Sequence, residues 1–255
     1  NLLKKFKCNI QYNGTNFNGF QCQPDKRTVE TELRNALSKF IQFENFSYAG
    51  RTDSGVHALG QVIVFSTSQK IEGKNIHRAM TSCVSKDINV MNVEECNTLF
   101  HARKSAKSRT YKYLFASQLI PIYVEPFITK INFEPVLNEL DEIQSIFKGK
   151  HDFIKFRATG SSTKTTIRTV NHLKIRKVIS PDLFNLKSQF EYYEIEIQAD
   201  GFLYKMVRNI VGAIFEILKK RKKCDELLDY LNQNNDNYRF MTAKAKGLCL
   251  VKVNY

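Results

Sequence analysis

The stretch of residues 48–58 constrains this chain more than any other, and it reads Tyr-Ala-Gly-Arg-Thr-Asp-Ser-Gly-Val-His-Ala. Two glycines bound a short polar loop, with the apolar residues 46–49 before it and 62–65 after it. Two strands joined by such a loop would hold Asp53 at a loop tip above a sheet. Loops on a rigid scaffold carry a large share of binding and catalytic residues. Asp53 is therefore the first candidate for a functional residue.

The charge balance indicates a polyanionic partner. The chain of 255 residues has 39 Lys and Arg against 25 Asp and Glu, a net charge of +14. Such a surplus is typical of proteins that bind nucleic acid or an anionic membrane surface, although a solubilising surface is the alternative. No stretch approaches the roughly 18 apolar residues that span a membrane. The first residues lack the apolar core of a signal peptide, so we expect a cytoplasmic protein with no membrane partner.

The cysteines indicate neither a metal site nor a disulfide framework. They form no Cys-x-x-Cys pair and have no nearby group of histidines. We expect reduced thiols that mostly pack in the interior, as in a cytosolic protein, and no bound metal. The six positions are Cys8, Cys22, Cys83, Cys96, Cys224 and Cys249.

Hydrophobic periodicity predicts an alternation of strands and helices in the first part of the chain. Residues 4–12 alternate apolar and polar, which predicts a half-buried strand. Thr28 is a helix N-cap, and apolar residues follow it at helical spacing. The strands on either side of the Asp53 loop come next. A helix over 75–85 and a strand over 87–93 complete this part.

The second part repeats the same order of elements. We expect strands over 109–115, 170–178, 192–199 and 247–253, with helices over 135–147, 202–220 and 225–232. Residues 180–189 and 232–237 read as exposed loops. The pattern favours an α+β protein of two similar units, residues 1–104 and 105–255, each with an antiparallel sheet and helices on one face.

The loop run resembles the signature of the TruA family of tRNA pseudouridine synthases, Gly-Arg-Thr-Asp-Ala-Gly-Val-His, with Ser54 in place of the alanine. The resemblance continues in register over essentially the whole chain. Asn13 and Phe20 replace the aspartate and the tryptophan of the family's opening block. The other matching stretches are 12–21, 100–103, 109–113, 151–157, 201–212 and 243–248.

The resemblance implies the pseudouridine synthase fold, with the two units flanking a basic active-site cleft. It implies that the protein isomerises uridine at positions 38–40, in the anticodon stem-loop of tRNA, and works as a homodimer. An isomerisation consumes no small-molecule cofactor, so none is expected.

Asp53 has two interpretations. A turn aspartate commonly bonds its own backbone, and the residues alone favour that role. The resemblance instead makes Asp53 the catalytic nucleophile. A carboxylate suits this chemistry because it can attack or stabilise an oxocarbenium-like sugar, or remove a proton, without a metal.

Three further residues are candidates for substrate binding. Arg208 is either a surface arginine or, by resemblance, the guanidinium that pairs with Asp53; helical spacing places it with Gly212 opposite the apolar face. Tyr111 lies on a strand and is either core or, by resemblance, the tyrosine that stacks on the flipped uracil. Arg51 would contact phosphate or fill the space that the flipped base leaves. His57 and His101 are expected to pack or to contact RNA.

Two other functions remain open from the sequence. A non-catalytic RNA-binding relative would have lost the carboxylate or its partners, yet Asp53, Tyr111 and Arg208 are all present. A glycosidase-like hydrolase would use Asp53 as nucleophile, but it normally needs a second, acidic carboxyl group, and the motif contains none.

Overall fold

The structure, a computed structural model, describes residues 3–160, 163–181, 189–233 and 239–255. The chain divides into two compact units. The first comprises Asn1–Arg109 together with the C-terminal Cys249–Tyr255, and the second comprises Thr110–Leu248. The boundary expected from the sequence lay between residues 104 and 105 and left the final strand with the second unit.

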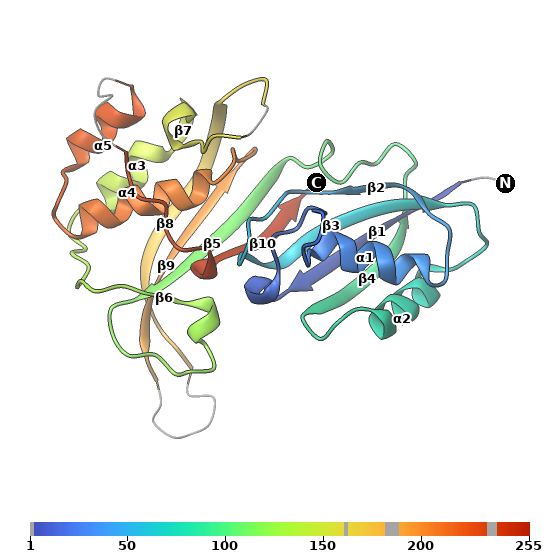
Figure 1. Cartoon of the computed structure of the whole chain (residues 1–255). Helices are drawn as coiled ribbons and strands as arrows, with labels where there is room; N and C mark the ends of the chain where they lie inside the picture. The colour runs from blue at the N-terminus through green and yellow to red at the C-terminus, as the bar shows by residue number, and fades with distance from the viewer. Residues whose placement is uncertain (1–2, 161–162, 182–188, 234–238) are drawn as a thin grey trace. The chain divides into compact units, whose positions relative to one another are not determined.

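The sheet of the first unit has the strand order β4-β1-β3-β10 (Figure 1). β2 pairs with residues 63–66 of β3, beyond the part of β3 that pairs with β10. β1 is antiparallel to both of its neighbours, whereas β10 runs parallel to β3. The sequence indicated an antiparallel sheet, and this last pair is the exception. The strands are β1 (Lys4–Tyr12), β2 (Glu44–Tyr48), β3 (His57–Thr67), β4 (Ile88–Cys96) and β10 (Leu248–Asn254), and the helices are η1 (Gly14–Asn16), α1 (Val29–Ser38) and α2 (Gly73–Cys83).

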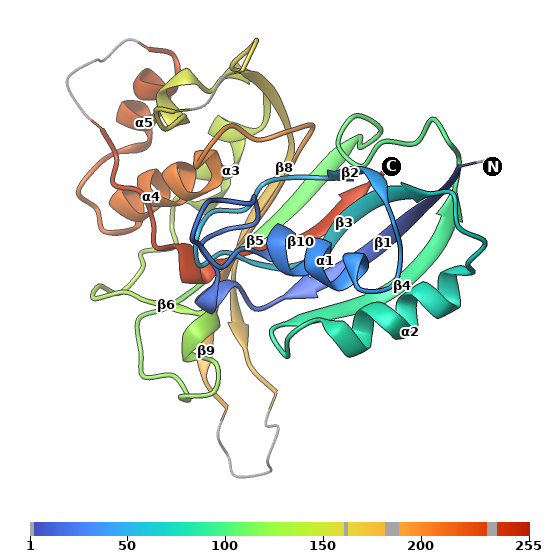
Figure 2. The ribbon, with the colours of Figure 1, turned by 45° about the vertical axis from the view of Figure 1, so that its right-hand side comes forward.

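The helices α1 and α2 cover one face of this sheet, as Figures 1 and 2 show from two directions. The predicted alternation of β1 is confirmed, because every second residue is buried: Phe6, Cys8, Ile10 and Tyr12. The predicted N-cap is also confirmed, since the Thr28 side chain accepts a hydrogen bond from the backbone of Thr31. These contacts build the main core of the unit.

The opposite face of the sheet is covered where β2 and β3 approach the Asp53 loop. Ala49, Val62, Val64 and Ala102 form a buried apolar cluster there, against which Phe100, Val253 and Tyr255 pack. β3 is therefore buried on both faces over much of its length. The loop stands on a strand that has little freedom to move.

The second unit has the strand order β5-β9-β8-β7, with β6 parallel to β5. β8 is antiparallel to β7 and β9. The helices α3, α4 and α5 accompany this sheet (Figure 1). The elements are β5 (Ser108–Ala116), η2 (Glu125–Phe127), β6 (Thr129–Lys130), α3 (Leu140–Phe147), β7 (Gly149–Asp152), η3 (Ile154–Phe156), β8 (Ile167–Ile179), β9 (Glu191–Ala199), α4 (Met206–Leu218), α5 (Cys224–Leu231) and η4 (Ala245–Gly247). The α+β fold class is confirmed.

The surroundings of α4 differ from the amphipathic helix expected over 202–220. The helix begins at Met206, after Lys205 adopts a left-handed conformation with φ of 57°. All of its residues are buried except Arg208 and Asn209. Gly212, expected on the polar side, lies against the segment 241–243, where an added Cβ would be 1.7 Å from the Met241 carbonyl oxygen. This close approach of two backbones requires glycine.

One predicted helix begins later than expected, and two predicted loops lie largely outside the described residues. The helix expected from residue 135 begins at Leu140, because the Val136 amide donates to the Leu218 carbonyl at the end of α4 instead of continuing a helix. The expected loops 180–189 and 232–237 lie largely outside the described residues. Within the described parts, no helix is both long and apolar enough to cross a membrane. All six cysteines are free thiols.

Candidate active site

Asp53 lies half-buried in the tight loop that connects β2 to β3. The Val56 amide donates to the Asp53 carbonyl oxygen at 3.1 Å, which closes a turn. Gly55 has a φ of 79°, a conformation that residues with a Cβ rarely adopt. The backbone of this turn is therefore fixed by hydrogen bonding and by glycine.

The segment 17–20 holds this loop from a second direction. The Phe20 amide donates to the Thr52 carbonyl at 3.1 Å, and the Gly55 amide donates to the Phe17 carbonyl at 3.3 Å. The Ser54 hydroxyl donates to the same Phe17 carbonyl at 3.2 Å. The serine that replaces the family's alanine thus adds a bond between the two segments.

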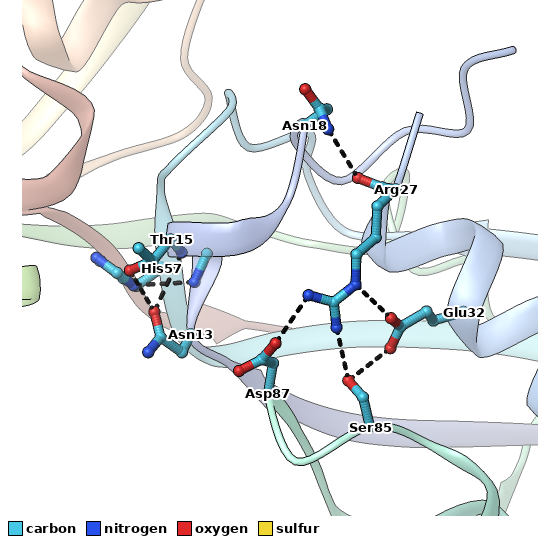
Figure 3. A network of polar contacts seen from close by, with 9 residues as sticks. Asn13, Thr15, Asn18, Arg27, Glu32, His57, Ser85 and Asp87 are labelled. Carbon is cyan, nitrogen blue, oxygen red and sulfur yellow. Dashed lines mark hydrogen bonds and ion pairs between the residues drawn. The ribbon is translucent and has the colours of Figure 1, made fainter. Parts of the chain in front are cut away.

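The turn that carries Asn13 and Thr15 lies next to His57, at the end of the loop (Figure 3). The Gly14 amide donates to Nδ1 of His57 at 3.0 Å, and His57 is 4% exposed. The imidazole therefore acts as an acceptor at Nδ1 and has a packing role. The side-chain oxygen Oδ1 of Asn13 accepts from the Thr15 amide and hydroxyl. An aspartate at position 13 would offer the same acceptor, so the replacement preserves this cap.

We expect Gly14→Ala to destabilise the first unit at the contact between this turn and the Asp53 loop. A Cβ on this residue would be 2.0 Å from the Val56 carbonyl oxygen, so the two backbones must separate. We expect a loss of roughly 3 kcal/mol or more in the free energy of unfolding, measured in urea. Asn16→Ala, at an exposed position of the same turn, is the control and should change stability little. Equal stabilities of the two variants would contradict the close contact.

A buried polar network lies beneath Thr52, the residue before Asp53. The Tyr12 hydroxyl and the Thr52 hydroxyl are 2.7 Å apart. The side-chain nitrogen Nε2 of Gln61 donates to the Gly50 carbonyl at 2.8 Å and lies 3.4 Å from the Tyr12 hydroxyl. Burial raises the pKa of Tyr12, so its hydroxyl stays neutral at all physiological pH values. The network joins β1 and β3 to Gly50 and Thr52, in the first part of the polar loop.

Removing one hydroxyl should show whether this network positions Asp53. Tyr12→Phe leaves the buried Thr52 hydroxyl without its partner, which costs about 1–3 kcal/mol of stability. We also expect a slower single-turnover rate, because Thr52 directly precedes Asp53. Tyr230→Phe, in the second unit, is the control and removes a hydroxyl that donates to the Lys155 backbone carbonyl. This control should lower the stability and leave the rate unchanged. An unchanged rate in Tyr12→Phe would show that the network stabilises the fold and does not position Asp53.

Arg27 fixes the segment 13–28 to the rest of the first unit (Figure 3). Its guanidinium contacts Glu32 at 2.7 Å, Asp87 at 2.9 Å and the Ser85 hydroxyl at 3.0 Å. The same guanidinium lies 4.3 Å from the centre of the Phe17 ring. Because Phe17 bonds the Asp53 loop, this ion pair network also contributes to holding the loop.

Arg51 is the predicted site residue closest to Asp53 in the chain. Its side chain is exposed, and Nε donates to the Tyr48 hydroxyl at 3.4 Å. The Tyr48 ring lies 4.5 Å from the ring of Phe20, which is fully buried. Phe20 therefore fills core where the family has tryptophan, and Arg51 is presented to solvent beside the loop.

Tyr111 and Arg208 belong to the second unit. Tyr111 is 7% exposed and meets the Phe202 ring edge-on at 5.2 Å. Nε of Arg208 donates to the Ala243 carbonyl at 2.8 Å, and the Ala243 amide donates to the Arg208 carbonyl at 3.1 Å. The guanidinium is thus held by the segment that packs along α4.

Tyr113, two residues after Tyr111 on β5, is a core residue. Its hydroxyl bonds Thr129 at 2.8 Å and donates to the Lys244 carbonyl at 2.9 Å. Burial raises its pKa to about 12. Among the residues that the structure describes, no three His, Cys, Asp or Glu side chains are grouped so as to hold a metal ion.

Comparison with known proteins decides the family. A family model described as tRNA pseudouridine synthase matches residues 9–103 and 144–255. The chain belongs to this family. Both the Asp53 loop and Arg208 lie within the matched residues, whereas Tyr111 lies between the two matched segments. The reaction of the family makes this protein an isomerase that acts on uridine in tRNA.

Individual synthases align over nearly the full chain. A tRNA pseudouridine synthase A from Thermoanaerobacter sp. (strain X514) is 37% identical over 248 residues, covering 96% of this chain and 97% of the relative. The enzyme of the same name from Limosilactobacillus reuteri is 34% identical, with 99% and 97% coverage. That from Buchnera aphidicola is 35% identical, with 99% and 92% coverage.

The residues that support the loop were missed by sequence reasoning. They are Tyr12, Gly14, Thr52 and Gln61, and most of their hydrogen bonds join segments that are far apart in the sequence. His57, which was expected to pack or to contact RNA, is buried. One signal was available. Gln61 directly precedes the apolar run 62–65, and a fully buried glutamine requires hydrogen-bond partners.

Proposed function

We propose that this protein converts uridine to pseudouridine at positions 38–40 in the anticodon stem-loop of tRNA, with Asp53 as the catalytic residue. The observation that carries the proposal is the Asp53 loop itself. Its backbone is held by Gly55, by the segment 17–20 and by the buried Tyr12 network, within a chain of the synthase family. Such support is what a catalytic group needs, since misplacement by 1 Å costs much of the rate.

The reaction breaks one bond to the ribose and forms another. The bond between uracil N1 and ribose C1′ breaks, the base turns, and C5 bonds to C1′. C5 then loses its proton and N1 gains one, so atoms and electrons balance without a co-reactant. The Asp53 carboxylate either attacks C1′ or removes a proton from the sugar; both routes need its ionised form. The target base must first leave its stack, which costs a few kcal/mol.

The other predicted residues receive supporting roles. Arg208 supplies a permanently charged, planar guanidinium for the Asp53 carboxylate. Tyr111 stacks on the flipped uracil, and Arg51 contacts phosphate or takes the place of the extruded base. The net charge of +14 supports binding of structured RNA mainly through phosphates and shape. We further propose that the protein acts as a homodimer in the cytoplasm and uses no cofactor.

Position-specific mapping tests the proposal. Purified protein is incubated with unmodified tRNA transcripts and no added cofactor, and pseudouridine is located by reverse transcription after chemical marking. We expect pseudouridine at one or more of positions 38–40 and nowhere else. Modification confined to other stems, or dependent on an added cofactor, would contradict the proposed site or chemistry.

A further inference from the structure

Within the part of the chain that the structure describes, some cations of the first unit form ion pairs with carboxylates, whereas a group near residues 103–107 does not. Between Asn97 and Val124 the sequence contains no aspartate or glutamate. Elsewhere in this unit, cations pair with carboxylates, as in Lys4 with Glu95, Lys7 with Glu94, Arg34 with Glu30 and Lys74 with Glu72. Arg103, Lys104 and Lys107 are exposed, and the described residues offer them no ion pair. Their charge is available to an external anion.

These cations stand on a structured turn, residues 101–107. The His101 amide donates to the Ser105 hydroxyl at 3.1 Å, and the Ser105 amide donates to the His101 carbonyl at 3.0 Å. Nδ1 of His101 accepts from the amides of Arg103 and Lys104 at 3.1 and 3.4 Å. Burial, followed by the charge of Lys104, lowers the pKa of His101, which favours the neutral imidazole that accepts both bonds.

Both ends of the turn are anchored to the C-terminal residues. Ala102 is fully buried, and its carbonyl accepts from the Tyr255 hydroxyl at 2.8 Å. The Lys107 amide donates to the Asn254 carbonyl at 2.8 Å. The backbone is therefore preorganised, and binding an anion here does not require ordering a loose segment.

Arg109 connects this turn to the strand that leads into the Asp53 loop. One nitrogen of its guanidinium donates to the Arg103 carbonyl at 2.8 Å and to the Ala49 carbonyl at 3.1 Å. Ala49 is four residues before Asp53, so at most about 14 Å of extended chain separates the two. A strand of RNA whose base reaches Asp53 passes within reach of the turn.

We propose that the turn 101–107 is a phosphate-binding site for the RNA backbone, in which Arg103, Lys104 and Lys107 contact phosphates next to the nucleotide at Asp53. The inference rests on the proposed function, because it takes tRNA as the ligand. It assigns binding, and not chemistry, to these three side chains. Phosphate contacts fix the register of a nucleic acid and make its affinity depend on salt.

The test compares two variants that lose the same charge. The first carries Arg103→Gln, Lys104→Gln and Lys107→Gln. The control carries Lys26→Gln, Lys39→Gln and Lys70→Gln, three exposed lysines of the same unit. The dissociation constant for tRNA is measured over a series of salt concentrations. We expect the first variant to bind about tenfold or more weakly and to lose roughly 2 to 3 from the slope of log K against log salt, and the control to change little.

A second measurement separates this site from the proposed function. The single-turnover rate at limiting enzyme should fall in the first variant together with its affinity for tRNA, whereas the control variant should keep the wild-type rate. Equal loss of affinity in both variants would mean diffuse charge and would overturn the site. An inactive wild type whose affinity still depends on the turn would refute the function and keep the site. Unfolding curves of both variants, expected to match wild type, confirm that the fold is retained.

Discussion

Asp53→Asn should abolish pseudouridine formation while tRNA binding and the fold remain. The amide keeps the shape of the side chain but cannot attack a sugar or accept its proton at a useful rate. We expect the single-turnover rate to fall by roughly 10³-fold or more, as for other catalytic carboxylates. Because the loop is held through the backbone of Asp53 and its neighbours, the substitution should leave the hydrogen bonds of the loop in place.

The matched control is Asp25→Asn. Asp25 is an exposed carboxylate of the same unit with a φ of 54°, a conformation that asparagine also tolerates. It should retain the wild-type rate. If Asp53→Asn turns over at more than a few per cent of wild type, Asp53 is not the catalytic group and the loop serves only to bind RNA.

Arg208→Lys should cost far more rate than an unchanged formal charge suggests. The bond from Nε to the Ala243 carbonyl fixes the plane of the guanidinium, and lysine has no nitrogen at that position of its side chain. A lysine ammonium also lacks the fork that binds a carboxylate through two bonds. We expect the single-turnover rate at saturating enzyme to fall by roughly 10²-fold.

Arg239→Lys is the control for this substitution, because Arg239 is an exposed arginine of the same unit. Arg239→Lys should keep the wild-type single-turnover rate, and any change should be confined to the affinity for tRNA. Wild-type chemistry in Arg208→Lys would show that α4 has a structural role here and that the partner of Asp53 lies elsewhere, with Arg51 the next candidate.

Local patterns predicted the elements well wherever one face of an element is buried. The alternation of β1 and the Thr28 N-cap follow directly from side-chain periodicity and capping chemistry. The Asp53 loop followed from its glycines and the apolar runs on either side. These features depend on residues close together in the chain, and their physics is therefore readable from a short window.

Contacts between distant segments could not be read in this way. The parallel pair of β10 with β3 joins Cys249 to His57, almost 200 positions apart, so neither window contains a signal for the other. The burial of Gly212 depends likewise on the segment 241–243. The delayed start of α3 reflects a backbone bond to α4 that competes with helix formation. The hydrogen bonds that hold the Asp53 loop are likewise contacts between distant segments.

The proposed site residues were found for a different reason. Physical patterns placed Asp53 in a turn and left Arg208 as a surface arginine; the resemblance to the synthases singled both out. The structure adds what the motif cannot express, namely that Thr52, Ser54 and His57 within the run hold its backbone in place. Under the proposed function, the motif combines one reacting side chain with the residues that fix its position.

The balance of products tests the central claim most directly. A tRNA labelled with tritium at C5 of its uridines is mixed with a stoichiometric amount of protein, and tritium in water, pseudouridine and free uracil are counted. Isomerisation predicts one tritium released per pseudouridine formed and no free uracil. Free uracil with abasic RNA would indicate a hydrolase, and bound RNA without tritium release a non-catalytic binder; either result would contradict the account.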